Sequence, residues 1–347
     1  MKHLELHILQ SFPVTCLNRD DLNSPKTAFF GGAQRARVSS QCWKRAVREL
    51  AQETLPEFFK GQRGRLIVEP LKAALLKEGF DEAKAIEAAK EIAKYLATYD
   101  EDAERKKGVL QVKTAYFTTQ GEIDKLAQAY KKSGEVKKAV KEIKPEDLKD
   151  AADISLFGRM VASDHTLTVE GAAMFSHALS VHKVDNEIDY FSTKEDFPNV
   201  DAGAAMTGTL EFNSATYYRF AALNLDMLFD KDHLAYLSEK ERKDVVKTFV
   251  KSVIEAVPVA RRNSQNGDVR PEHVLCVIRE KGHPVQLINA FEEPVFSKNG
   301  IVKRSIEELE KEYTNLKEKW EVLAVKEIRL PEKKMSELLA EVEKYVK

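Results

Sequence analysis

The residues best suited to chemistry form one basic segment, Asn18–Arg48. The segment holds seven cations against two acids, Asp20 and Asp21, which gives a net charge of +5 in a chain whose net charge is −1. Lys and Arg at this density neutralise phosphates and release counterions from a polyanion without reading its sequence. The segment therefore predicts contacts to a phosphate backbone, made by Arg19, Lys26, Arg35, Arg37, Lys44, Arg45 and Arg48.

A helix should carry the second half of this segment. Ser39 or Ser40 can cap a helix that runs to about residue 54. At about 100° per residue, one helix face is polar and the opposite face is apolar and can dock on a sheet. Unpaired N–H groups and the helix dipole at the N-terminus favour an anion, and the two serine hydroxyls add donors. The polar face consists of Gln41, Lys44, Arg45 and Arg48, and the apolar face of Trp43, Ala46, Val47 and Leu50.

Other interpretations of these residues are open. The basic face could be an ordinary solvated helix surface with i,i+4 ion pairs, although few acids are available to it. Asp20-Asp21 could hold a metal for phosphodiester cleavage, but beside so many cations the pair is more typical of turn formation and local ion pairing. His177 and His182 flank a strand-like run and favour hydrogen bonding over metal binding. The stretch 203–209 has the spacing of a phosphate-binding loop without its lysine, and it predicts a flexible turn.

No enzyme signature accompanies the basic segment. The GxGxxG, HExxH and GxSxG patterns are absent from the sequence. The three cysteines, Cys16, Cys42 and Cys276, are far apart and form no CxxC pair, which is typical of a reducing cytoplasm. Neither a signal peptide nor a membrane-spanning run is evident. We expect a cytoplasmic chain with no catalytic residue, no metal site, no cofactor and no membrane partner.

The elements that must position the segment indicate an α+β fold. Residues 3–10 predict a strand with Leu4, Leu6 and Ile8 on one face. Residues 60–150 are rich in Lys, Glu and Ala and predict a helical insertion, whereas 185–212 lacks helical periodicity and predicts a long hairpin or an extended arm. Further strands are expected near 215–228, 273–280 and 321–330, and helices near 238–256 and 303–320. Because the strands are scattered along the chain, the core should be discontinuous.

Four stretches, in order, resemble one known family. They are CLNRDDLNSPKTAFFGGAQRARVSSQCWKRAVR at 16–48, DISLFGRM at 153–160, HALSVHKVDNEIDYFSTKED at 177–196 and GTLEFNSATYYRFAALNLD at 208–226. The family is CasC, the backbone subunit of the type I-E CRISPR surveillance complex Cascade. The resemblance covers most of residues 1–260.

The resemblance implies an RRM-like (ferredoxin-like) palm with a helical fingers insertion and a β-hairpin thumb. The palm would comprise residues 1–59, 151–185 and 213–347. The fingers would be 60–150 and the thumb 186–212. Several copies would stack along one CRISPR guide RNA (crRNA) in a filament with other Cascade subunits, and the exposed bases would pair with target DNA.

The resemblance also implies which residues hold the RNA. Phosphates and riboses would be held by Arg19, Lys26, Ser39, Gln41, Lys44, Arg45 and Arg48. Met160 would pack against a base or sugar, and Ser192, Met206 and Thr207 would lie where the thumb folds over a displaced nucleotide. The candidate RNA-binding set is completed by Arg35, Arg37, Ser40 and Arg159.

Two other functions remain open at this stage. Backbone subunits of type III complexes look similar and cut target RNA with a loop aspartate, which would make Asp20 or Asp21 the suspects. The chain could also be a generic single-stranded RNA-binding protein that acts alone.

Overall fold

The computed structural model describes residues 2–144, 149–161, 164–194, 204–258 and 263–347. The chain divides into two compact units, and both are discontinuous in sequence. Unit 1 comprises 1–50, 175–222 and 250–342, and unit 2 comprises 51–174, 223–249 and 343–347. Residues 151–174 and 223–249 therefore group with the helical insertion rather than with the sheet.

Unit 1 is built on an antiparallel sheet. The strand order is β11-β10-β1-β9-β7-β3-β2, and β8 pairs with β9 off this path. In the middle of the sheet Leu6 faces Cys276, and Cys276 faces Ile328 on the next strand. The strands are β1 (His3–Thr15), β2 (Thr27–Phe30), β3 (Ala33–Val38), β6 (Ala173–Phe175), β7 (Ala178–Ser180), β8 (Glu187–Lys194), β9 (Ala204–Asn224), β10 (His273–Arg279) and β11 (Lys326–Leu330).

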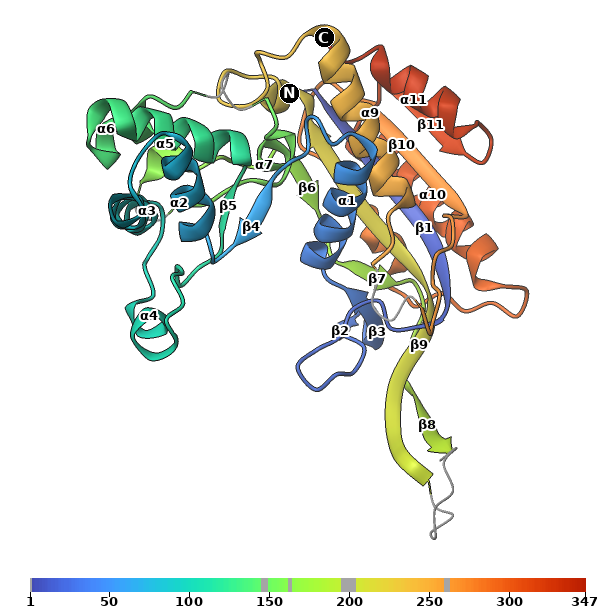
Figure 1. Ribbon diagram of the computed structural model, residues 1–347. Helices are drawn as coiled ribbons and strands as arrows, with labels where there is room; N and C mark the ends of the chain where they lie inside the picture. The colour runs from blue at the N-terminus through green and yellow to red at the C-terminus, as the bar shows by residue number, and fades with distance from the viewer. Residues whose placement is uncertain (1, 145–148, 162–163, 195–203, 259–262) are drawn as a thin grey trace. The chain divides into compact units, whose positions relative to one another are not determined.

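Helices cover both faces of this sheet (Figure 1). Neighbouring strand residues point to opposite faces, and Tyr217 and Tyr218 of β9 show this directly. Tyr217 packs with Trp43 of α1 (Ser40–Thr54), whereas Tyr218 packs with Leu309 of α10 (Ile301–Trp320). The 3₁₀ turn η3 (Ile288–Phe291) lies on the α10 side, and α11 (Met335–Glu343) follows β11.

Part of the long strand β9 leaves the sheet to form a hairpin with β8 (Figure 1). The register runs from Glu187 opposite Phe212 to Lys194 opposite Ala204, with an irregularity at Thr193/Lys194. This confirms the paired strands of the long hairpin predicted for 185–212, whose residues 195–203 lie outside the described residues. The flexible turn predicted for 203–209 is wrong for 204–209, which belong to β9, and residue 203 lies outside the described residues.

Unit 2 is mainly helical, as the Ala-rich amphipathic pattern predicted. Leu71, Leu75, Ile92 and Leu126 meet in its core, and Asp81 and other side chains cap the helix N-termini. Its elements are α2 (Val68–Lys77), α3 (Glu82–Leu96), α4 (Glu101–Lys107), α5 (Gln120–Ser133), α6 (Val136–Lys141), α7 (Ala152–Phe157), η2 (His165–Leu167), α8 (Leu225–Leu228) and the ribbon β4 (Gln62–Gly64) with β5 (Tyr116–Thr118). Helix α9 (Glu239–Glu255) begins in unit 2 and ends in unit 1.

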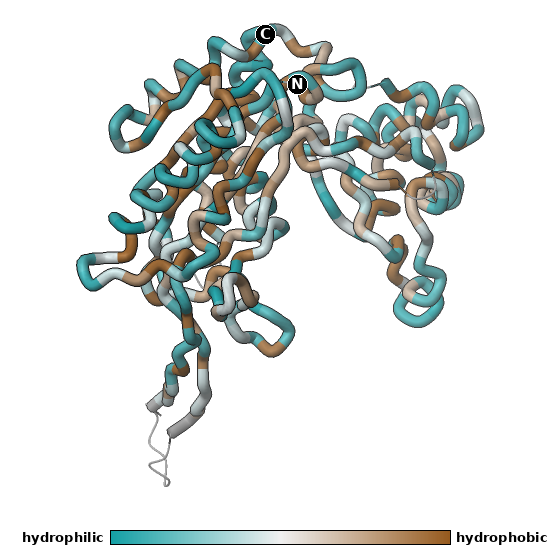
Figure 2. Tube along the Cα trace, turned by 180° about the vertical axis from the view of Figure 1, so that it is seen from behind, coloured by the Kyte–Doolittle hydropathy of each residue, from teal (hydrophilic) through white to brown (hydrophobic). Residues whose placement is uncertain are grey.

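Apolar residues follow the sheet strands, while polar residues dominate the outer helices (Figure 2). The predicted α+β fold is confirmed at the level of mixed helices and strands, and the structure shows that the sheet is antiparallel. The helix expected from Ser39 or Ser40 to residue 54 is α1. None of the helices in the described part of the chain is long and apolar enough to cross a membrane.

Candidate nucleic-acid interface

The first part of the basic segment is a loop tied to the start of α1. The Asn18 side chain accepts from the Ser39 N–H at 2.9 Å, and the Asn18 carbonyl accepts from the Lys26 N–H at 2.9 Å. One oxygen of Asp20 accepts from the N–H groups of Leu22 and Ser24, both at 2.9 Å. Asp20 is thus a turn former, as the sequence favoured.

The loop and hairpin cations are partly engaged with the backbone. Arg19 donates to the carbonyl oxygen of Asn23 at 3.1 Å and to its side-chain oxygen at 2.6 Å. Arg37 donates from Nε to the Thr27 carbonyl at 3.3 Å, and its own N–H donates to the Lys26 carbonyl at 2.8 Å. Arg19, Lys26 and Arg37 are all half-buried, so parts of these side chains remain at the surface.

The N-terminus of α1 is capped by the protein itself. The Ser40 N–H donates to Nδ1 of His177 at 2.9 Å, and the Cys42 N–H donates to the Ser39 hydroxyl at 3.3 Å. Ser39 is buried and Ser40 is half-buried, with its hydroxyl directed at Gln41. The sequence predicted that unpaired N–H groups and serine hydroxyls here would bind an anion. This prediction is wrong for the Ser39 hydroxyl and for the Ser40 N–H, because both are used within the protein.

The predicted two-faced character of α1 is confirmed. Trp43, Ala46 and Val47 are buried, whereas Gln41 and Arg45 are exposed. Lys44 and Arg48 are half-buried, and burial lowers the pKa of Lys44, whose ammonium lies 5.8 Å from the centre of the Phe175 ring.

Arg45 has an intramolecular partner. Its Nε lies 2.7 Å from a carboxylate oxygen of Glu49, and this hydrogen bond raises the pKa of Arg45. The side chain is still 73% exposed. An exposed pair of this kind contributes little to stability, so a phosphate can replace the Glu49 carboxylate at small cost.

Arg35 corrects the candidate set. Its side chain is fully buried and donates to four carbonyls, those of Phe30, Ser180, Phe291 and Glu292, at 3.2, 2.9, 2.9 and 3.1 Å. A guanidinium enclosed by carbonyls cannot reach a phosphate. Arg35 instead fixes the β2–β3 hairpin to the η3 turn. The two are in close contact, because a Cβ added to Gly31 of the hairpin would lie only 1.5 Å from the carbonyl oxygen of Glu292, which follows η3.

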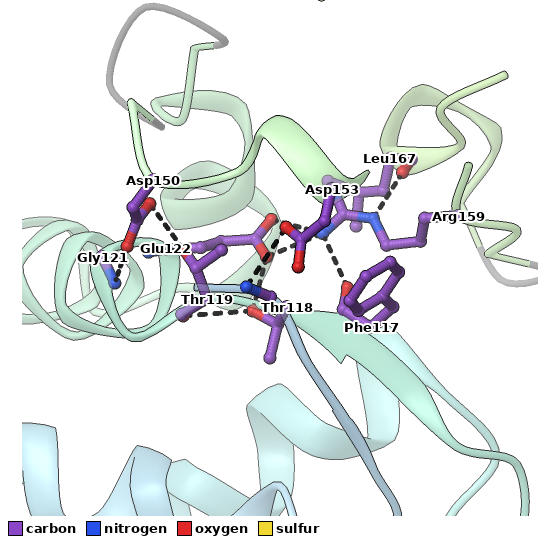
Figure 3. Close-up of polar contacts among 10 residues, drawn as sticks. Phe117, Thr118, Thr119, Gly121, Glu122, Asp150, Asp153, Arg159 and Leu167 are labelled. Atoms are coloured by element: carbon purple, nitrogen blue, oxygen red, sulfur yellow. Dashed lines mark hydrogen bonds and ion pairs between the residues drawn. The ribbon is translucent and has the colours of Figure 1, made fainter. Parts of the chain in front are cut away.

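Arg159 is a second correction (Figure 3). It is buried in unit 2, donates to both carboxylate oxygens of Glu122 at 2.8 and 2.7 Å, and also donates to the carbonyls of Phe117 and Leu167. Burial alone would lower the pKa of Arg159, but the Glu122 carboxylate raises it. The guanidinium organises the interior of unit 2 and is not available to RNA.

The remaining candidates are exposed in two places. Met160, next to the buried Arg159, has 86% of its surface exposed. In the β8–β9 hairpin Ser192 lies opposite Thr207, and Met206 lies opposite Thr193, so Met206 is on the other hairpin face from Ser192 and Thr207. Met160 belongs to unit 2 and the hairpin to unit 1.

The sequence did not predict which hydrogen bonds hold the basic segment Asn18–Arg48 in place. His177 was expected to make hydrogen bonds, and it does, but its position at the N-terminus of α1 was not predicted. His182 likewise accepts from the Thr216 N–H at 3.2 Å. The described residues contain no cluster of three or more His, Cys, Asp or Glu suited to a metal.

Comparisons with known proteins place this geometry in a wider context. The sequence model of the CT1975-like protein family matches residues 4–344. A solved chain of a "CRISPR RNA-guided surveillance complex, pre-nicking" is 26% identical, with a TM-score of 0.84 over 99% of this chain and 100% of that one. A chain of a "CRISPR RNA-guided surveillance complex" is 22% identical, with a TM-score of 0.63 over 99% of both chains, and it shows similarity of fold. No curated protein matches.

Proposed function

Because the chain belongs to the CT1975-like protein family, we propose that it is a non-catalytic, crRNA-binding backbone subunit of a Cascade-type surveillance complex in the cytoplasm. Copies line up along the guide RNA through an RRM-like palm, and the β8–β9 hairpin serves as the thumb. The guide is then presented for pairing with target DNA, while the protein itself contacts backbone.

The observation that carries this proposal is the similarity, over its whole length, to a chain of an RNA-guided complex. The basic segment supports it independently. Lys26, Arg37 and Arg45 remain at least partly exposed on a loop, a hairpin and a helix that are connected by hydrogen bonds of Asn18 and of the Lys26 backbone. Such a prearranged set of cations suits a phosphate chain of any sequence.

The first test is the size of the protein with and without RNA. Light scattering of the purified chain, alone and with a guide RNA, should give a discrete multimer only when RNA is present. An unchanged size would contradict the backbone-subunit role and favour a single-strand binder that acts alone.

The second test is the salt dependence of RNA binding. Replacing both Lys44 and Arg45 by Gln should lower the slope of log K against log[salt] by about 1.4 per bound copy, since each single-strand phosphate contact contributes ~0.7. Arg304→Gln is the matched control, because Arg304 is an exposed helix arginine paired with Glu307 and Glu308 on α10. A loss confined to some RNA sequences would contradict backbone binding.

The non-catalytic part of the proposal rests on Asp20. Its carboxylate oxygen is used by two backbone N–H groups of its own turn, which suits a structural role better than metal binding. Incubation of the RNA-bound assembly with complementary RNA and Mg²⁺ should leave that RNA intact. Regularly spaced cuts that disappear in Asp20→Asn or Asp21→Asn would establish the ribonuclease alternative.

A further inference from the structure

A second basic segment, Lys60–Arg65, begins 12 positions after Arg48 and lies in unit 2. It forms β4, whose Arg63 faces Phe117 of β5. All three residues of β4 are exposed, whereas all three of β5 are buried. In this two-stranded β4–β5 ribbon, β4 is therefore exposed to solvent and is held by the buried strand β5.

One end of this segment is fixed at Gly61. The Gly61 N–H donates to Asp153 at 3.2 Å, and the Gln52 side chain donates both to the Gly61 carbonyl at 2.8 Å and to Asp153 at 3.1 Å. A Cβ on Gly61 would lie 2.4 Å from a carboxylate oxygen of Asp153. The close approach of Asp153 thus requires glycine here.

The other end is fixed at Arg65. Its Nε donates to the Val112 carbonyl at 2.9 Å, the Val112 N–H donates to the Arg65 carbonyl at 2.9 Å, and its Nη2 lies 2.7 Å from Asp100. Arg65 is therefore neutralised and structural. The residues between the two ends are held in place before any ligand arrives.

The positive charge of Lys60, next to the Gly61 end, and of Arg63, between the two ends, is not balanced. Lys60 and Arg63 are exposed, and within the described part of the chain neither has a carboxylate within 4 Å. Arg105 of the same unit differs, because it pairs with Asp102 at 2.7 Å. Gly64 adds no side chain beside Arg63, and a Cβ there would meet only the backbone nitrogen of Leu66, at 4.0 Å, so a nucleic-acid strand can approach the ribbon closely.

An exposed arginine on a rigid, glycine-flanked ribbon is suited to a phosphodiester, because its planar fork donates two parallel hydrogen bonds and loses little freedom on binding. We infer that Lys60 and Arg63 form a second nucleic-acid contact that binds the phosphate backbone of a single strand. This inference rests on the proposed function. The strand is either the guide RNA or the DNA that pairs with it, since both offer the same phosphates.

The test uses the full chain with Lys60 and Arg63 both replaced by Gln, and Arg105→Gln as the control. Two arms are measured over a range of salt: binding of guide RNA to the chain, and binding of complementary single-stranded DNA to the RNA-bound assembly. In one arm the slope of log K should fall by about 1.4 per copy, and affinity at physiological salt should fall about tenfold. The arm that responds identifies the strand, and Arg63→Lys should retain most of the slope.

Unchanged slopes in both arms would overturn the inference. A change in multimer size without a change in either slope would also overturn it, since the ribbon would then contact protein. If the proposed function itself is wrong, the wild-type chain will form no RNA-dependent multimer, and this result distinguishes that failure from a failure of the inference about Lys60 and Arg63. Circular dichroism melting of the variants verifies that unit 2 is folded in each comparison.

Discussion

Replacing Arg35 by Met tests whether a buried arginine in the basic segment stabilises the fold rather than binding RNA. Met keeps much of the apolar stem but removes the four hydrogen bonds to the carbonyls of residues 30, 180, 291 and 292. Each such bond is worth about 1 kcal/mol net, and more for a charged donor, so unit 1 should lose roughly 4 kcal/mol of unfolding free energy. That is a large fraction of the stability of an ordinary domain.

The chain offers a convenient assay for this loss. Both of its tryptophans, Trp43 and Trp320, belong to unit 1, so fluorescence-monitored urea unfolding reports that unit. Arg35→Met should lower the urea midpoint without changing the salt slope of RNA binding at temperatures where the variant is folded. Arg45→Met should do the reverse, because an exposed ion pair contributes at most about 1 kcal/mol. A stability loss below about 1 kcal/mol for Arg35→Met, together with a reduced salt slope, would refute the structural assignment of Arg35.

Three further predictions concern unit 1. Gly31→Ala should destabilise the unit far more than Gly32→Ala, because both have positive φ but only Gly31 meets backbone, and urea midpoints of the two variants compare them directly. Burial and nearby cations lower the pKa of His177, so the unfolded state binds the proton of this side chain more tightly than the folded state does. The free energy of unfolding should therefore fall as the pH drops below about 6.5. In His177→Gln the urea midpoint should depend less on pH. Burial alone would raise the pKa of Glu5, but hydrogen bonds from two histidines and the charge of a buried arginine lower it to about 2, so its stabilisation is present above pH 4.5 and is lost as pH falls toward 2. Glu5→Gln should cost roughly 3–5 kcal/mol at neutral pH and flatten the acid-unfolding curve, and an unchanged curve would show that the carboxylate is not the group that titrates.

The elements that were predictable from the sequence are those that periodicity determines. Trp43, Ala46 and Val47 recur at helical spacing, and they form the buried face of α1. The hairpin at 185–212 was recognisable because that stretch lacks such spacing. In β1, Leu4 and Leu6 are buried as their alternation predicted.

The partners of buried charges were not predictable in this way. His3, Glu5 and His7 alternate on the second face of β1, a polar pattern that suggests a solvated face, yet all three are buried. They are stabilised by each other and by Arg279, which is 274 residues from Glu5 in sequence. Such pairings depend on tertiary contacts, and a single sequence does not reveal them.

The same limitation explains why arginines were misjudged at the candidate site. Arg35 and Arg45 lie ten positions apart in one basic segment, but Arg35 is enclosed by carbonyls from distant loops while Arg45 is 73% exposed. Composition counts both as positive charge, and only the structure shows which charge can meet a phosphate. Because the protein also caps the N-terminus of α1 with His177 and Ser39, the proposed RNA binding would rely mainly on exposed cationic side chains rather than on the helix dipole. Binding of this kind should be strongly salt-dependent and indifferent to base sequence, which is what a subunit that holds any guide requires.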